Sequence, residues 1–340
     1  MKTICFREPT NKNIAAAAKI IRKGGLLGIP TETVYGLGAN ALNEQAVYNI
    51  FAAKGRPQDN PLIIHVPDAS WLSRYCENVP DSAYRLAEEF WPGPLTMILP
   101  RKDIVPLRTT GGLLSVGVRC PDHPITLAII READVPIAAP SGNTSGRPSP
   151  TSADDMIEDM DGKIDAIFDG GPCRVGVESS IIDLTCQPPR LLRAGGLPLE
   201  ELTRVLGEVV VDKCITQQMS AAEKPKAPGM KYRHYAPKAP VTVVTGAPEE
   251  SACYIAAHAK PGVGVICFHE YTGCFSGCAV HDLGPQNDKA EQARRVFDAL
   301  REFDHESVTQ IFAQCPDPEG LGLAIGNRLK KAAGFHVVEL

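Results

Sequence analysis

The strongest constraint on the fold of this chain is that short apolar runs and helical patterns alternate in two separate series. Between the two series, residues 211–240 lose this periodicity and are rich in Pro, Ala, Lys and Gln, a composition typical of a linker. A chain of 340 residues also exceeds the usual size of one domain. We therefore expect two α/β domains, at residues 1–210 and 241–340, joined by a linker at 211–240.

The expected elements follow from apolar runs that suit buried strands and from capped, amphipathic segments that suit helices. In the first domain we expect strands at 26–29, 62–66, 95–99, 116–118, 137–139, 166–168, 180–183 and 190–192, and helices at 14–22, 44–53, 81–90, 125–131 and 152–160. In the second domain we expect strands at 241–245, 263–268 and 309–313, and helices at 249–259, 288–303 and 321–333. The second series has the rhythm of a small, parallel, Rossmann-like sheet.

The composition excludes several classes of protein. The net charge of -5 gives no overall attraction to nucleic acid or to an anionic membrane. The chain has no apolar stretch long enough to span a bilayer, and Arg7 and Glu8 lie where a signal peptide needs an apolar core. Eleven cysteines, an odd number scattered along the chain, suit free thiols better than a disulfide framework. We expect a cytoplasmic protein.

Three polar loops next to predicted strands are candidates for a site that binds anions. The first, residues 30–40, contains Thr33 among several hydroxyl groups, and Gly36 and Gly38 allow close approach of a backbone. Taken alone, this loop is better explained as a tight turn from a strand to a helix. It becomes a candidate site only because the other two loops share its chemistry.

The second loop carries Lys54 and Arg56 two residues apart, on a turn stiffened by prolines, with the amide of Asn60 nearby. Both cations can reach one anionic group, although a solvated basic turn is the simpler explanation for such a pair. His65 follows inside an apolar strand. A core histidine and a substrate-binding histidine are equally good interpretations of it.

The third loop, residues 139–151, crowds Ser141, Asn143, Ser149 and Thr151 at the end of a predicted buried strand. It matches neither the Walker A pattern nor the G-x-S-x-G nucleophile elbow, and no Walker A pattern occurs in the chain. A classical P-loop nucleoside triphosphatase is therefore excluded.

Three further segments add polar groups to strand ends. Ser115 and Arg119 lie on one face of a predicted strand, where a buried arginine needs an anionic partner, and a structural ion pair is the alternative. Ser179 enters one strand and Arg193 leaves another. A group in the second domain, His269, Cys274, Cys278 and His281, has poor spacing for zinc and is interpreted as loop and core residues.

Taken together, the segments PTETVYGLGAN, KGRPQDNPLIIHV, SVGVRCPDHP, APSGNTSGRPSPT, GVESSIIDL and LLRAG resemble the YrdC/Sua5 family of threonylcarbamoyl-AMP synthases. The resemblance covers about residues 10 to 206. The segment PGMKYRHYAP and the second domain are similar to the longer, two-domain Sua5 type.

This resemblance implies an open, twisted, mixed α/β sheet with a basic cavity, plus the smaller Rossmann-like domain. The implied enzyme is a nucleotidyltransferase that converts L-threonine, bicarbonate or CO2 and ATP to threonylcarbamoyl-AMP and pyrophosphate, with Mg2+ accompanying the ATP. The product would pass to a tRNA threonylcarbamoyl transferase complex that modifies adenosine 37, and a contact with tRNA itself is compatible with this role. No carboxylate cage for a metal is evident, so the ion is expected on the phosphates.

The resemblance also implies roles for individual residues. Lys54 and Arg56 would supply catalytic charge. The threonine site would contain Thr33, His65, Arg119, Ser141 and Ser179. The nucleotide site would contain Arg56, Asn60, Ser115, Asn143, Ser149, Thr151, Arg193 and Tyr235. The linker residues Tyr232, His234 and Tyr235 could close over both sites, which would protect a carbamate from water.

Two other functions remain open at this stage. A basic, concave domain could bind structured RNA by its phosphates without doing any chemistry, although the acidic net charge argues against this as the main role. A carbamoyl-transfer domain is the second alternative, but the zinc-finger and acylphosphatase segments that usually accompany it are not visible. Release of pyrophosphate from ATP that depends on threonine and bicarbonate would separate the three.

Overall fold

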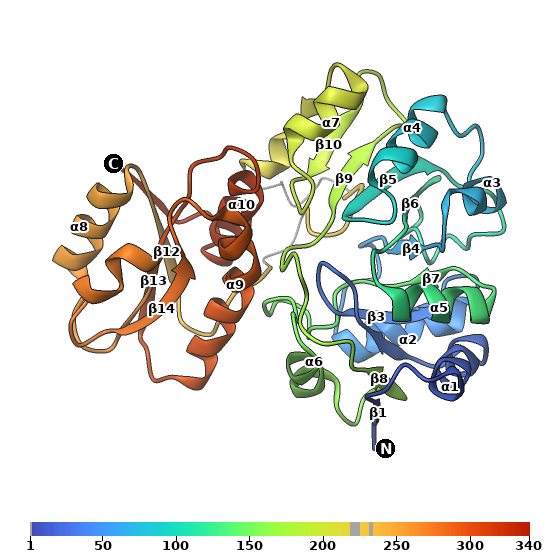
Figure 1. Cartoon of the computed structure of the whole chain (residues 1–340), viewed down its shortest axis with the longest axis horizontal. Coiled ribbons are helices and arrows are strands. Elements are labelled where there is room, and N and C mark those ends of the chain that lie inside the picture. Colours follow the sequence, from blue (N-terminus) through green and yellow to red (C-terminus); the bar gives the residue numbers. More distant parts are fainter. Residues whose placement is uncertain (1, 218–224, 231–233) are drawn as a thin grey trace.

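The computed structural model of the chain describes residues 2–217, 225–230 and 234–340, which form two α/β units side by side (Figure 1). The first unit is built on an 11-stranded mixed sheet and the second on a 5-stranded sheet whose neighbouring strands are all parallel. The predicted fold class is therefore confirmed.

The first unit contains most of the secondary structure. Its strands are β1 (Ile4–Phe6), β2 (Leu27–Ile29), β3 (Gly36–Asn40), β4 (Ile63–His65), β5 (Leu95–Pro100), β6 (Ser115–Arg119), β7 (Ile137–Ala138), β8 (Ala166–Phe168), β9 (Ser180–Asp183), β10 (Arg190–Arg193) and β11 (Val210–Val211). Its helices are α1 (Asn11–Arg22), α2 (Glu44–Lys54), α3 (Leu72–Tyr75), α4 (Asp81–Phe90), α5 (Pro124–Ala133), α6 (Ala153–Met160) and α7 (Leu199–Leu206), with 3-10 turns at η1 (Ala69–Trp71) and η2 (Lys213–Ile215).

The order of strands in the large sheet is β1-β8-β2-β3-β7-β4-β6-β5-β9-β10-β11. Its register places His65 of β4 opposite Arg119 of β6, and Arg119 opposite Thr96 of β5. Strands that are far apart in the sequence thus place the polar residues His65, Arg119 and Thr96 side by side across the sheet.

One predicted loop is partly a strand. Residues 36–40 form β3, which pairs antiparallel with β2 and with β7. A Cβ added to Gly38 would lie 2.9 Å from Cγ2 of Ile137, so this glycine allows close packing of neighbouring strands. The interpretation of 30–40 as one continuous loop is wrong, and only residues 30–35 form the turn.

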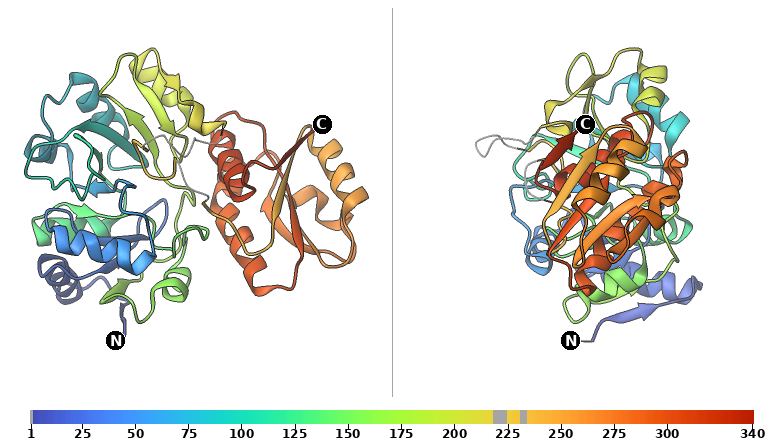
Figure 2. Two further views of the ribbon diagram at one scale, coloured as in Figure 1. Left: turned by 180° about the vertical axis from the view of Figure 1, so that it is seen from behind. Right: turned by 90° about the vertical axis from the view of Figure 1, so that its left-hand side faces the viewer.

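The second unit contains β12 (Val241–Thr245), β13 (Val263–Phe268), β14 (Ala279–Gly284), β15 (Gln310–Gln314) and β16 (Val337–Glu339), in the sheet order β14-β13-β15-β12-β16. Its helices are α8 (Pro248–His258), α9 (Lys289–Glu302) and α10 (Gly322–Ala332), with 3-10 turns at η3 (His269–Cys274) and η4 (Phe303–His305). The helices α9 and α10 lie between this sheet and the first unit, and α8 lies on the far face (Figures 1 and 2).

The interface between the units is closely packed. One cluster of buried apolar residues runs from the first unit into α9 and α10, where it includes Phe297 and Ile325. The described part of the linker joins this cluster through Ala227, Met230 and Tyr235. The predicted boundary at residue 210 falls within β11, which pairs with β10. The two units therefore share apolar core.

Two general expectations can be compared with the structure. All 11 cysteines lie in the described residues and are free thiols, as the sequence predicts. Within the described ranges, no helix is both long and apolar enough to cross a membrane.

Candidate active site

A cavity lined mainly by polar and charged residues opens in the first unit against the linker. Its wall is formed by Val34, Lys54, Arg56, Ile63, His65, Arg119, Ala139, Pro140, Ser141, Asn143, Ser145, Gly146, Glu178, Ser179, Arg193, Pro228, Gly229, His234 and Tyr235. All three predicted loops contribute to this wall, as do the ends of several strands and the linker. The cavity is therefore the place where the separate sequence signals meet.

Most of the residues predicted for the site line this one cavity. They are Lys54, Arg56, His65, Arg119, Ser141, Asn143, Ser179, Arg193 and Tyr235. The others lie outside its wall, namely Thr33, Asn60, Ser115, Ser149 and Thr151. Tyr232, predicted for the lid, lies outside the described residues, whereas His234 lines the cavity.

Arg119 is held by the first loop from behind. Its Nη2 lies 2.7 Å from a carboxylate oxygen of Glu32 and donates to Oγ1 of Thr33 at 2.8 Å. The Arg119 and Glu32 side chains are both buried. The alternative of a structural ion pair is thus realised, yet Arg119 also lines the cavity, so its guanidinium is fixed in place and still able to meet an anion.

His65 faces the cavity as a neutral ring. Its Nδ1 lies 3.2 Å from the carbonyl oxygen of Ile137, which can only accept, so Nδ1 carries the proton and Nε2 is an acceptor. Burial, assisted by the positive charge of Arg119, lowers the pKa of His65 to about 3. His65 is therefore suited to accept a hydrogen bond from a hydroxyl or amino group of a ligand.

Lys54 ends α2 and holds the third loop. The chain turns away at Gly55, which has a left-handed φ of 63°. The Lys54 Nζ donates to the carbonyl oxygen of Ser141 at 2.5 Å and also to that of Asn143. Burial and the neighbouring charge of Arg56 lower the pKa of Lys54 well below its ordinary value. An anionic ligand in the cavity would offset this effect.

Arg193 lies at the opposite wall, next to the strand that begins after Ser179. Its Nε donates to the Ser179 carbonyl oxygen at 3.0 Å, and its Nη2 donates to the Ser179 Oγ at 3.0 Å. The Ser179 Oγ is also 2.8 Å from Oγ1 of Thr96 on β5. Burial lowers the pKa of Arg193 to about 10, against the opposing effect of Glu178. This cation remains charged at neutral pH.

Glu178 is a cavity residue that the sequence analysis did not select. It accepts from Oγ of Ser149 at 2.7 Å and from Nε of Arg328, on α10, at 2.7 Å. Burial alone would raise the pKa of Glu178, but Arg328, Arg193 and Ser149 together lower it to about 2. The only sequence signal was its place beside Ser179, since its partner Arg328 is far away in the chain.

The predicted residues outside the cavity wall have other contacts. Ser149 donates to Glu178, and Thr151 donates to Asp298 on α9. Asn60 is buried, and its side-chain oxygen has no hydrogen-bond partner in the described part of the chain. Ser115 begins β6 opposite Pro100. Their assignment to the nucleotide site stays a prediction.

The linker closes one side of the cavity with aromatic rings. The Tyr235 ring lies 5.1 Å from that of Phe297 on α9, measured between centroids, and 5.5 Å from that of His234. The guanidinium carbon of Arg328 is 5.6 Å from the centroid of the Tyr235 ring. The second unit therefore supports the linker where the linker faces the cavity.

The described residues do not include a group of three His, Cys, Asp or Glu side chains that could hold a metal ion. Glu178, an acidic residue of the cavity wall, already uses its two oxygens on Ser149 and Arg328.

The cavity wall combines the cations of Lys54, Arg56 and Arg193 with a fixed arginine, Arg119, a neutral histidine and hydroxyl groups. Such a set can hold a polyanion next to a small polar molecule that has both donors and a carboxylate. Such a cavity on a mixed α/β sheet is typical of enzymes that bind the phosphates of a nucleotide and align a second substrate with them.

Comparison with known proteins narrows this class. A family profile described as "Telomere recombination" (Sua5_yciO_yrdC) matches residues 19–195, and one described as "Threonylcarbamoyl-AMP synthase, C-terminal domain" (Sua5_C) matches residues 197–334. The chain is 49% identical to the threonylcarbamoyl-AMP synthase of Pyrococcus abyssi over 96% of each chain. It is 47% identical to that of Bacillus subtilis over 96% of this chain and 94% of the relative.

Comparison of the fold with solved structures leads to the same family. The crystal structure of P. abyssi Sua5 complexed with L-threonine superposes with a TM-score of 0.94, at 46% identity, over 100% of both chains. The chain belongs to the Sua5 family of threonylcarbamoyl-AMP synthases.

Proposed function

We propose that the chain synthesises L-threonylcarbamoyl-AMP from L-threonine, bicarbonate or CO2 and ATP, with release of pyrophosphate. The observation that carries this proposal is that the cationic turn with Lys54 and Arg56 and the strand ends with His65 and Arg119 line a single cavity. The crystal structure of P. abyssi Sua5, a relative with the same fold, contains L-threonine, which supports the choice of amino acid.

In this proposal, threonine binds at the strand ends. Arg119 pairs with the carboxylate, because its guanidinium is already oriented by Glu32 and Thr33. The Nε2 of His65 accepts from the hydroxyl or amino group. Ser141 and Ser179 line the same cavity and can complete the hydrogen bonds of a small zwitterion.

ATP binds across the cationic turn. Lys54 and Arg56 face the phosphates, and Asn143, Arg193 and Tyr235 contact the rest of the nucleotide. Mg2+ enters on the phosphates as part of the substrate, because this ion prefers oxygen ligands such as those of the phosphates. Ser149 and Thr151, which are also predicted for the nucleotide site, hold the loop that carries Asn143 through Glu178 and Asp298.

The reaction then needs alignment and charge more than a strong base. The ammonium group of threonine first loses a proton to solvent. The amine nitrogen then forms a C–N bond to the bicarbonate carbon, and a C–O bond of that carbon breaks to release water and leave a carbamate. A carbamate oxygen forms a bond to the α-phosphorus of ATP. The bond between that phosphorus and the oxygen that bridges it to the β-phosphorus breaks, and pyrophosphate is released. Fixed cations stabilise the charge that develops on the phosphates.

The test is to measure pyrophosphate release from MgATP by the purified full chain. We expect release that requires both L-threonine and bicarbonate, with threonylcarbamoyl-AMP identified by mass. Release without threonine but with carbamoyl phosphate would point to carbamoyl transfer. Tight RNA binding without any release would point to a binding module. Either result would overturn the proposal.

The product is a mixed anhydride, which water hydrolyses, so a consuming enzyme must be close by. We propose that a tRNA threonylcarbamoyl transferase complex uses it in the cytoplasm to modify adenosine 37, since the relatives of this chain are threonylcarbamoyl-AMP synthases and the activated threonylcarbamoyl group needs an acceptor. Direct contact of this chain with tRNA belongs to the same proposal.

A further inference from the structure

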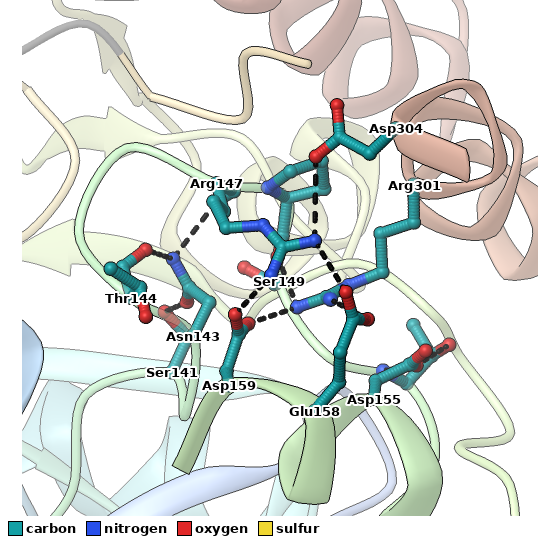
Figure 3. Close-up of polar contacts among 12 residues, drawn as sticks. Ser141, Asn143, Thr144, Arg147, Ser149, Asp155, Glu158, Asp159, Arg301 and Asp304 are labelled. Atoms are coloured by element: carbon teal, nitrogen blue, oxygen red, sulfur yellow. Dashed lines mark hydrogen bonds and ion pairs between the residues drawn. The ribbon is translucent and has the colours of Figure 1, made fainter. Parts of the chain in front are cut away.

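The segment 147–151 leaves the cavity wall and runs along the second unit (Figure 3). Residues 148–151 belong to neither a helix nor a strand. Three alternate residues contact or approach the second unit. Arg147 Nη2 lies 3.3 Å from Oδ2 of Asp304, and Thr151 donates to Asp298, whereas Ser149 reaches Arg328 through Glu178. The second unit therefore holds the outer half of the loop.

The centre of this contact is Asp159 on α6, shared by two arginines. Asp159 accepts from Arg147 Nη1 at 2.5 Å and from Arg301 Nη2, on α9, at 2.6 Å. The side chain of Arg301 is 3% exposed and that of Asp159 is 1% exposed, so water does little to weaken the pair. Arg301 Nη2 also donates to the Pro148 carbonyl oxygen at 2.9 Å. Arg301 thus holds the loop backbone directly at Pro148, and it holds the Arg147 side chain indirectly because both arginines pair with Asp159.

Hydrogen bonds continue from Arg147 to the cavity. Asn143 Nδ2 donates to the Arg147 carbonyl oxygen at 2.8 Å and to that of Thr144 at 2.9 Å. Asn143 Oδ1 accepts from Ser141 Oγ at 2.6 Å. Figure 3 shows these groups as one connected set between the cavity loop and α9. The position of Arg147 therefore sets the orientation of the Asn143 amide, which lines the cavity.

We propose that Arg301, on the second unit, is a positioning residue of the nucleotide site, because it holds the 141–151 loop in the conformation that presents Asn143 to ATP. The inference deepens the proposed function and rests on it. Arg301 does not line the cavity, so its effect on ATP is transmitted through Asp159, Pro148 and Arg147.

The test compares Arg301→Gln with Arg294→Gln in the full chain. Arg294 is on the same helix but pairs with Glu291 of that helix, and its side chain is 44% exposed. For Arg301→Gln we expect the KM for ATP to rise about tenfold, the effect of losing a hydrogen bond to a charged group, and the KM for threonine to change less than about twofold. Arg301→Lys should recover part of the ATP affinity. Arg294→Gln should behave like the unmodified chain.

A second variant covers the case in which Arg301→Gln does not fold. In Asp159→Asn/Arg301→Gln, neither buried charge is left without its partner, so the thermal midpoint should recover. The KM for ATP should stay raised, because the loop has lost both holds.

Three outcomes overturn the inference. They are an unchanged KM for ATP in the folded variants, an equal rise in both KM values, and a normal KM for ATP in the double variant. If the unmodified chain shows no threonine-dependent release of pyrophosphate, the proposed function fails and this inference fails with it. If the unmodified chain shows threonine-dependent release and the variants keep its KM for ATP, the proposed function stands and the inference alone fails.

Discussion

Arg56 combines a cationic side chain in the cavity wall with a hydrogen bond to the Pro61 carbonyl oxygen at 3.3 Å. Arg56→Ala should lower the rate of pyrophosphate release by about 10² to 10³, as loss of one electrostatic donor does in other enzymes. The thermal midpoint should change less than the rate does, because Arg56, although buried, lies on a turn and is not part of the apolar clusters. Arg108→Ala, which removes a contact with Gln58 outside the cavity, is the control. Near-normal turnover of Arg56→Ala would contradict the assignment.

His65 should stay neutral through the physiological pH range. Its pKa of about 3 lies below that of the unfolded chain, so the unfolded state takes up a proton first as pH falls. The stability of the fold should therefore decline from about pH 6.5 toward 3, and this part of the decline should be absent in His65→Asn. The ring 15N shifts should show the Nδ1-protonated neutral form at pH 5.5 in the apo chain. A titration near pH 6.5 would be incompatible with this geometry.

Several site residues could be predicted from the local sequence because the residues next to them in the chain indicate an unusual position. Arg56 follows Lys54 on a proline-stiffened turn, and His65 interrupts an apolar strand. Glu178 and Arg301 could not be predicted in this way. Their partners Arg328 and Asp159 are brought near only by the packing of the two units, and a single sequence carries no signal of that packing.

At the scale of elements, the pair between Glu178, just before β9, and Arg328 on α10 joins the cavity wall to the second unit. Glu178→Gln should lower stability at pH 7 by about 3 kcal/mol, because Arg328 loses its buried counter-charge. The pKa of Glu178 is depressed to about 2, so the contribution of the pair is fully present above about pH 4.5 and is lost progressively as the pH falls toward 2. The difference in thermal midpoint between variant and unmodified chain should therefore shrink as pH falls from 4.5 toward 2.

The control for this pair is Glu201→Gln, which removes an exposed partner of Arg204 and should have almost no effect on the thermal midpoint. A difference for Glu178→Gln that is constant from pH 7 to pH 2 would show that the charge of Glu178 is not what matters.

Elements with strong local patterns were predicted closely. The helix Asp81–Phe90 and the strand Ser180–Asp183 have the bounds expected from sequence. The strands β3 and β14 were missed for physical reasons. Glycines weaken the strand signal in β3, and β14 is only half-buried, with a polar mixture of residues. Such strands are stabilised by their neighbours in the sheet, which local periodicity does not report.

At the scale of the whole molecule, the second unit and linker should be required for full activity. A chain ending before Val211 lacks Tyr235 from the cavity wall, as well as Arg301 and Arg328 behind it. Such a fragment should release pyrophosphate at least tenfold more slowly at the same MgATP concentration, on the order expected for lost positioning contacts. Circular dichroism would establish that it is folded. Equal activity of a folded fragment would refute the role of both the linker and the second unit.

The division into two α/β units could be read from the sequence because the periodic pattern stops between them. Their shared core could not, since Phe297 and Ile325 look like ordinary apolar positions of amphipathic helices. The sequence predicted a linker between separate domains, and the structure shows described linker residues buried in a continuous apolar cluster.

The strand pairing at the edge of the large sheet has a consequence for folding during translation. The strand Ile4–Phe6 pairs in parallel with Ala166–Phe168. On the ribosome, the earliest strand must therefore wait, unpaired, until more than half of the first unit has been translated. Its short length keeps this waiting edge from offering much backbone to other nascent chains.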